Sequence, residues 1–65
     1  MPGLTLKAAR ANKGLTQEEA GKLIGVSADT ISNWERYISF PDVVQLKQIE
    51  RVYGIGYQDL IFLPM

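Results

Sequence analysis

Apolar residues recur every three or four positions along most of the chain, and no stretch alternates cleanly between apolar and polar residues. The first pattern is typical of helices that bury one face, whereas strict alternation would indicate strands. We therefore predict an all-α fold. Its five helices are expected to span residues 4–12, 16–24, 28–36, 41–53 and 57–62.

Local signals mark the junction between the second and third helices. Thr16 and Glu19 have the spacing of a capping box, in which a hydroxyl and a carboxylate pair with free amides at a helix start. Gly25 can adopt a left-handed conformation that ends the second helix, and Ser27 can cap the third. Because only Val26 lies between them, the two helices should meet at a steep angle.

Three further residues suggest how the other helices are placed. Gly21 is a poor helix former, so its position predicts that another helix approaches closely there. Pro41 suits the first turn of the fourth helix, and Asp42 lies where the helix dipole favours a negative charge. The apolar residues that we expect the second and fourth helices to bury are Ala20, Leu23, Ile24, Val43 or Val44, Leu46, Ile49, Val52 and Tyr53.

The third helix has two faces of different character. At about 100° per residue, Ile31 and Trp34 point one way, and we expect both in the core. The residues on the opposite face are small or polar, and they are Ala28, Asp29, Ser32, Asn33 and Arg36. A face without bulky aliphatic side chains can lie against the base edges of DNA.

The composition narrows the classes of function. A chain of 65 residues is expected to form a single domain over residues 1–65. It contains no Cys and no His, which excludes disulfides, zinc fingers and thiol nucleophiles, so we expect no metal, no cofactor and no enzymatic activity. It also has no apolar run that could cross a membrane and no signal-peptide core, so we expect a cytoplasmic protein.

The formal net charge is zero, which argues against binding to nucleic acid, because Lys and Arg normally supply much of the affinity for phosphates. The amide groups at helix N-termini offer phosphate contacts that do not depend on net charge. These amide contacts partly compensate for the absence of a net positive charge.

The segment LTQEEAGKLIGVSADTISNWE resembles the helix-turn-helix of the lambda repressor-like family of phage repressors and Cro proteins. The later segment PDVVQLKQIERVYGIGYQDLI resembles the end of the family's domain, and together the likeness covers roughly residues 4–61. The resemblance implies a compact five-helix DNA-binding domain whose third helix enters the major groove. The residues whose spacing carries it are Gln17, Gly25, Ser27, Ile31, Trp34 and Glu35.

By this resemblance, Ala28, Asp29, Ser32 and Asn33 would face base edges. Asn33 is the strongest candidate, since a side-chain amide can pair with adenine through two hydrogen bonds. Asp29 could accept a hydrogen bond from a cytosine amino group or could stabilise the helix N-terminus, and both interpretations stay open.

The resemblance also implies backbone contacts and an ion pair. Gln17 would meet a phosphate and brace the third helix, with Thr30 and Arg36 as further phosphate contacts. The family often pairs an Arg in the first helix with the Glu that ends the third, so we expect a partly buried salt bridge between Arg10 and Glu35. This chain departs from many relatives in having Arg36-Tyr37 where they carry Gly, and in a loop, YISF, without basic residues.

Family members often bind two-fold sites as dimers, so the resemblance implies a homodimer on a palindromic operator in double-stranded DNA. We expect a sequence-specific transcriptional regulator of the phage or prophage repressor or Cro type, without room for a ligand-sensing domain. An alternative is a protein-interaction module on the same fold, such as an antitoxin-like or anti-regulator subunit, which the apolar segments YISF and IFLPM favour. The dimer candidates are Ile38, Phe40, Phe62, Leu63 and Met65.

Overall fold

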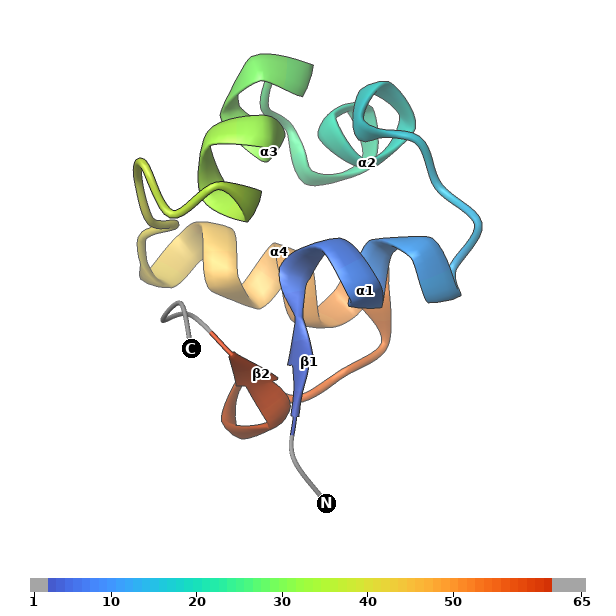
Figure 1. Ribbon diagram of the computed structural model, residues 1–65, viewed down its shortest axis with the longest axis vertical. Coiled ribbons are helices and arrows are strands. Elements are labelled where there is room, and N and C mark those ends of the chain that lie inside the picture. Colours follow the sequence, from blue (N-terminus) through green and yellow to red (C-terminus); the bar gives the residue numbers. More distant parts are fainter. Residues whose placement is uncertain (1–2, 62–65) are drawn as a thin grey trace.

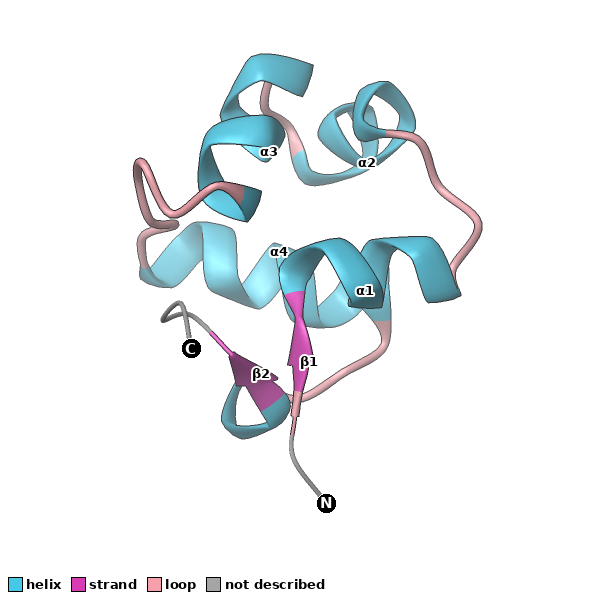
Figure 2. Ribbon diagram, viewed as in Figure 1, coloured by secondary structure: helices cyan, strands magenta, loops and turns pink. Residues whose placement is uncertain are grey.

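The computed structural model describes residues 3–61, and helices dominate that part of the chain (Figures 1 and 2). Figure 1 shows α2 and α3 in an upper layer, α1 and α4 beneath them, and a short strand pair at the foot. The elements are β1 (Leu4–Thr5), α1 (Leu6–Asn12), α2 (Gln17–Ile24), α3 (Ala28–Glu35), α4 (Val43–Tyr53), the 3₁₀ helix η1 (Tyr57–Asp59) and β2 (Leu60–Ile61).

The prediction of five helices is wrong, because the described residues form four α-helices and a two-stranded parallel sheet. Leu4 lies opposite Leu60 in that sheet, and Thr5 lies opposite Ile61. The first helix starts late because the Thr5 hydroxyl accepts a hydrogen bond from the Ala8 amide at 3.1 Å, which makes Thr5 the N-cap. The sheet therefore ties together the two ends of the described chain.

The caps expected for α2 and α3 are confirmed. The Thr16 hydroxyl accepts from the Glu19 amide at 3.1 Å, and the Glu19 carboxylate accepts from the Thr16 amide at 2.9 Å. The Ser27 hydroxyl accepts from the Thr30 amide at 3.1 Å. Gly25 has a φ of 98°, a left-handed conformation that a side chain would make costly. These contacts fix where α2 ends and α3 begins.

The start of α4 differs from the prediction, because Pro41 lies before the helix instead of opening it. Asp42 is the N-cap, and its carboxylate accepts from the Gln45 amide at 2.8 Å. The Gln45 side-chain oxygen accepts from the Asp42 amide at 2.8 Å, which completes a second capping box. The spacing of Asp42 and Gln45 was the sequence signal for this start.

A single apolar core lies between the two helical layers. Three of the expected core positions are wrong. Leu23 is exposed, neither Val43 nor Val44 is buried, since each is 69% exposed, and Leu46 is only partly buried and lies outside the core cluster. Leu23 precedes the buried Ile24 by one residue, which rotates it about 100° away from the core. The valines occupy the first turn of α4, whereas the buried residues of that helix, Ile49 and Tyr53, lie in its later turns. The buried residues are Leu6, Ala9, Ala20, Ile24, Ile31, Trp34, Ile49, Tyr53 and Leu60.

Gly21 does mark a close approach, but the neighbour is the turn after α2 and not another helix. A Cβ atom on Gly21 would lie 2.5 Å from the carbonyl oxygen of Val26. The Gly21 carbonyl accepts hydrogen bonds from the amides of Gly25, at 2.7 Å, and Val26, at 2.8 Å. The missing side chain thus lets the turn fold back tightly onto α2. Within residues 3–61, no helix has the length and apolar character needed to cross a membrane.

Candidate nucleic-acid interface

The helix α3 lies at the edge of the molecule, in the layer farthest from the strand pair (Figure 1). It is anchored from below by Ile31 and Trp34, which are both buried, as expected. The helical repeat therefore turns the opposite face of α3 outward. That face is the candidate surface for contact with DNA.

The residues expected at base edges lie together on this outward face. Asp29 is exposed, and Ala28, Ser32 and Asn33 are each partly exposed. The main-chain carbonyl of Asn33 accepts hydrogen bonds from the amides of Ile38, at 2.9 Å, and Ser39, at 3.4 Å. The loop after α3 thus holds the backbone at Asn33 in place.

The residues expected at phosphates lie around the margin of the face. Gln17 is the first residue of α2, and Arg36 is an exposed residue at the C-cap of α3. The Thr30 hydroxyl lies 3.0 Å from the Ser27 hydroxyl, so it already takes part in the cap of α3. Its orientation is set by that contact.

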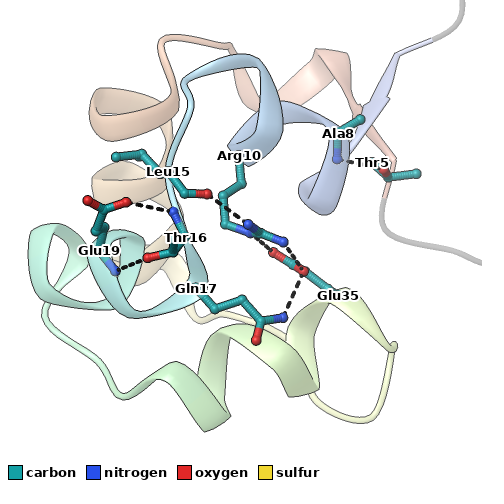
Figure 3. Close-up of polar contacts among 8 residues, drawn as sticks. All are labelled: Thr5, Ala8, Arg10, Leu15, Thr16, Gln17, Glu19 and Glu35. Atoms are coloured by element: carbon teal, nitrogen blue, oxygen red, sulfur yellow. Dashed lines mark hydrogen bonds and ion pairs between the residues drawn. The ribbon is translucent and has the colours of Figure 1, made fainter.

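Arg10 and Glu35 form an ion pair beneath the interface (Figure 3). Nε of Arg10 donates to Oε2 of Glu35 at 2.6 Å, and Nη2 donates to Oε1 at 3.1 Å. The exposed fractions of the two side chains are 13% and 4%, so the pair is largely shielded from water. The hydrogen bond with Glu35 raises the pKa of Arg10 above its ordinary value.

Two further hydrogen bonds extend the ion pair into a network. Nη1 of Arg10 donates to the main-chain carbonyl of Leu15 at 2.8 Å, and Nε2 of Gln17 donates to Oε1 of Glu35 at 3.2 Å (Figure 3). The network joins α1, the loop before α2, the first residue of α2 and the last residue of α3. Two-pronged contacts between guanidinium and carboxylate are directional as well as strong. They hold α3 at a fixed angle to α1 and α2.

The side chain of Tyr53, from α4, lies close enough to the ion pair for the charges of Glu35 and Arg10 to act on its hydroxyl. This side chain is buried, and burial, together with the negative charge of Glu35, raises the pKa of the hydroxyl to about 12. The hydroxyl therefore stays neutral beside the ion pair. The sequence interpretation placed Tyr53 in the core but gave it no relation to Glu35.

A family model described as helix-turn-helix matches residues 6–60. The chain belongs to the lambda repressor-like helix-turn-helix family. The HTH-type transcriptional regulator ImmR of Bacillus subtilis (strain 168) is similar to it, with 32% identity over 59 residues. The match covers 91% of this chain and 46% of ImmR, so the chain spans about half the length of that relative.

In this helix-turn-helix domain the residue after Arg36 has an unusual backbone. Tyr37 has a φ of 61°, in the left-handed region that favours glycine. Its amide donates to the carbonyl of Trp34 at 3.2 Å, which ends α3 and starts the return of the chain toward α4. The position has a backbone conformation that suits Gly, and it belongs to the pair Arg36-Tyr37 at which the sequence departs from the Gly-containing pattern of many relatives.

The surface beside α3 carries two of the predicted dimer residues. Ile38 and Phe40 are both more than half exposed in the loop between α3 and α4. Phe62, Leu63 and Met65 lie outside the described residues. Among residues 3–61 no group of acidic side chains could hold a metal ion.

Proposed function

We propose that this chain is a sequence-specific regulator of transcription that binds double-stranded DNA with α3 in the major groove. The observation that carries the proposal is the outward face of α3, which presents small and polar side chains on a helix held by the network at Arg10 and Glu35. Its family membership supports the same docking geometry. A helix fixed in this way can read bases without first being ordered.

The contacts divide into those that read sequence and those that position the domain. Asn33 pairs with adenine, and the methyl group of Ala28 packs against thymine. Asp29 and Ser32 complete the surface that faces the base edges. Gln17, Thr30 and Arg36 contact phosphates, and the amides at the start of α2 add contacts that need no basic side chain.

More specifically, we propose a phage or prophage repressor or Cro-like protein that binds a palindromic operator as a homodimer. A second copy doubles the contacts that a small module can make, and this matters for a chain with no net charge. The dimer contacts that we propose from the sequence are Ile38 and Phe40, with Phe62, Leu63 and Met65. Because few phosphates are neutralised, binding should weaken with salt less steeply than for a basic protein.

A second candidate function is a protein-interaction module on the same fold. The observation that favours it is the group of exposed apolar residues after α3, which are Ile38, Phe40, Val43 and Val44. A stable protein partner together with no DNA retention at low salt would favour this function over the first.

The test is selection of bound sequences from a random pool of duplex DNA at low salt. We expect a palindromic consensus, and an unenriched pool would overturn the proposal. Asp59→Ala is the matched control, since Asp59 is an exposed residue of η1 and is not among the residues proposed to contact DNA. This variant should yield the same consensus as the unmodified chain.

A further inference from the structure

The strand pair of β1 and β2 lies at the foot of the molecule, and none of the proposed DNA contacts belongs to it (Figure 1). Leu4 lies opposite Leu60, and Thr5 lies opposite Ile61. Leu60 is buried in the core, so β2 is anchored to the rest of the fold. Because β1 pairs with this anchored strand, the pair sets where the chain enters α1.

The chain before β1 approaches the other strand so closely that there is no room for a side chain at Gly3. A Cβ atom on Gly3 would lie 2.1 Å from the main-chain carbonyl oxygen of Asp59, the residue that precedes β2. Glycine is the residue that permits such an approach between two backbone segments. Any larger residue at this position would therefore push the two strands apart.

Thr5 belongs both to the strand pair and to the start of α1. Its backbone lies opposite Ile61, and its hydroxyl accepts from the Ala8 amide and caps the helix (Figure 3). The helix has only seven residues. Isolated helices shorter than about 12 residues are marginal in water. The order of α1 therefore depends on its cap and on its packing against the core.

Arg10 connects α1 to α3. It lies in the last turn of α1, and its guanidinium donates to the Glu35 carboxylate at 2.6 Å and 3.1 Å. Two-pronged contacts of this kind depend on the orientation of both groups. If α1 shifts or frays, the ion pair weakens, and α3 loses part of the support that fixes its angle.

We propose that Thr5 is a positioning residue for DNA readout, through which the pairing of β1 with β2 controls the orientation of α3. The strand pair places the cap of α1, α1 places Arg10, and Arg10 holds Glu35. The inference rests on the proposed function and goes beyond it, because it gives residues outside the proposed DNA contacts a role in specificity. Sequence is read through base contacts, which need α3 at a defined angle. A disturbance at Thr5 should therefore lower discrimination between DNA sequences.

The first test follows the Nε–H group of Arg10 in ¹H–¹⁵N spectra of the folded chain. Thr5→Val removes the capping hydroxyl but keeps the shape of the side chain. The Arg10 resonance should shift, and exchange of its Nε–H with solvent should become about fivefold faster as α1 frays. Thr5→Ser keeps the hydroxyl and should show the unmodified resonance and rate. Gly3→Ala should act like Thr5→Val, because the added Cβ atom separates the strands.

Asp42→Ala is the matched control for a general loss of stability. It removes the cap of α4 at a comparable cost to folding, and Asp42 is not part of the connection from Thr5 to Glu35. The Arg10 signal should not change in this variant. An Arg10 signal that is unchanged in Thr5→Val, or that changes equally in Asp42→Ala, would overturn the proposal. If Gly3→Ala lacks a helical circular dichroism spectrum, the variants at Thr5 and Asp42 decide alone.

DNA binding by the same proteins separates this proposal from the proposed function. Fluorescence anisotropy measures affinity for a selected site and for a scrambled site, and the ratio of the two cancels charge effects common to all DNA. Thr5→Val should lower this ratio about fivefold, whereas Thr5→Ser and Asp42→Ala should not. An unchanged ratio in a chain that binds its site overturns the role of Thr5 and leaves the DNA-binding function standing. If Arg10 responds as expected but the unmodified chain binds no DNA site, Thr5 positions Arg10 and the proposed function is wrong.

Discussion

The side-chain amide of Gln17 donates to the Glu35 carboxylate at 3.2 Å, which connects the first residue of α2 to the last residue of α3. The contact couples the proposed phosphate-binding residue to the helix proposed to read bases. A phosphate bound at Gln17 would therefore be held in fixed register with α3. Positioning and readout would become parts of one rigid unit.

Gln17→Ala should lower affinity for all DNA sequences by a similar factor. The loss of a phosphate contact carries no sequence information, and the lost hydrogen bond to Glu35 should cost about 1 kcal/mol of stability. Anisotropy titrations with a selected site and a scrambled site measure both affinities. A loss confined to the selected site would contradict the assignment of Gln17 to phosphate.

The ion pair of Arg10 and Glu35 should contribute strongly to folding. Glu35→Ala leaves the Arg10 guanidinium shielded from water without its partner, so the free energy of unfolding should fall by about 3 kcal/mol. Urea denaturation followed by circular dichroism measures this change.

The double variant Arg10→Met with Glu35→Leu is the control for this pair. It removes both charges, so it should be more stable than Glu35→Ala alone. If the free energy of unfolding lost by the double variant equals the sum of the losses of Arg10→Met alone and Glu35→Leu alone, the two residues act independently.

The features that sequence alone predicted correctly depend on residues close together in the chain. The caps at Thr16 and Ser27 need partners only three residues away, and the outward face of α3 follows from the helical repeat. The pairing of Leu4 with Leu60 was missed, because it joins opposite ends of the described chain through strands too short for a periodic pattern.

Two errors show where local signals compete or remain incomplete. Pro41 and Asp42 both resemble helix starts, and only the hydrogen bonds to Gln45 show which of them is the boundary. Gly21 correctly indicated a close approach, but the sequence could not show that the approaching segment is the turn after α2. For the site, periodicity alone selected the α3 face, whereas the roles of Asn33 and Gln17 toward DNA came from resemblance to a family.

The Tyr53 hydroxyl should make stability fall at high pH. Its pKa in the folded chain is about 12 against an ordinary value of 10.0, so the folded state holds this proton more tightly than the unfolded state. The associated stability is fully present below pH 10 and is lost as the pH rises toward 12. Denaturation of Tyr53→Phe and the unmodified chain across that window should show a shallower loss for the variant. If stability falls equally with pH in both proteins, the Tyr53 hydroxyl is not the cause.

Tyr37 should carry a backbone cost that glycine removes. A left-handed conformation costs a side-chain-bearing residue about 1–2 kcal/mol, and glycine loses roughly half of that benefit to its greater freedom when unfolded. Tyr37→Ala is the control, since it removes the ring but keeps a Cβ atom at the same φ. Tyr37→Gly should therefore be more stable than Tyr37→Ala by about 0.5–1 kcal/mol in thermal or urea unfolding. Equal stabilities would mean that the backbone at this position relaxes at no cost.

Asn33→Ala should reduce affinity for the selected DNA site while leaving binding to scrambled DNA nearly unchanged. The loss should be about 1–3 kcal/mol, because the amide supplies two hydrogen bonds to one base. A repeat of the random-pool selection should then show relaxed preference at one position in each half-site.

Asp29→Ala separates the two interpretations of that carboxylate. If Asp29 accepts from a cytosine amino group, the variant should lose preference at a second base position while its stability stays constant. If instead it stabilises the start of α3 through the helix dipole, unfolding should become easier by roughly 0.5 kcal/mol. In that case the consensus should remain the same. An unchanged consensus for Asn33→Ala as well would remove base readout from this part of α3, since Ser32 and Ala28 alone offer little discrimination.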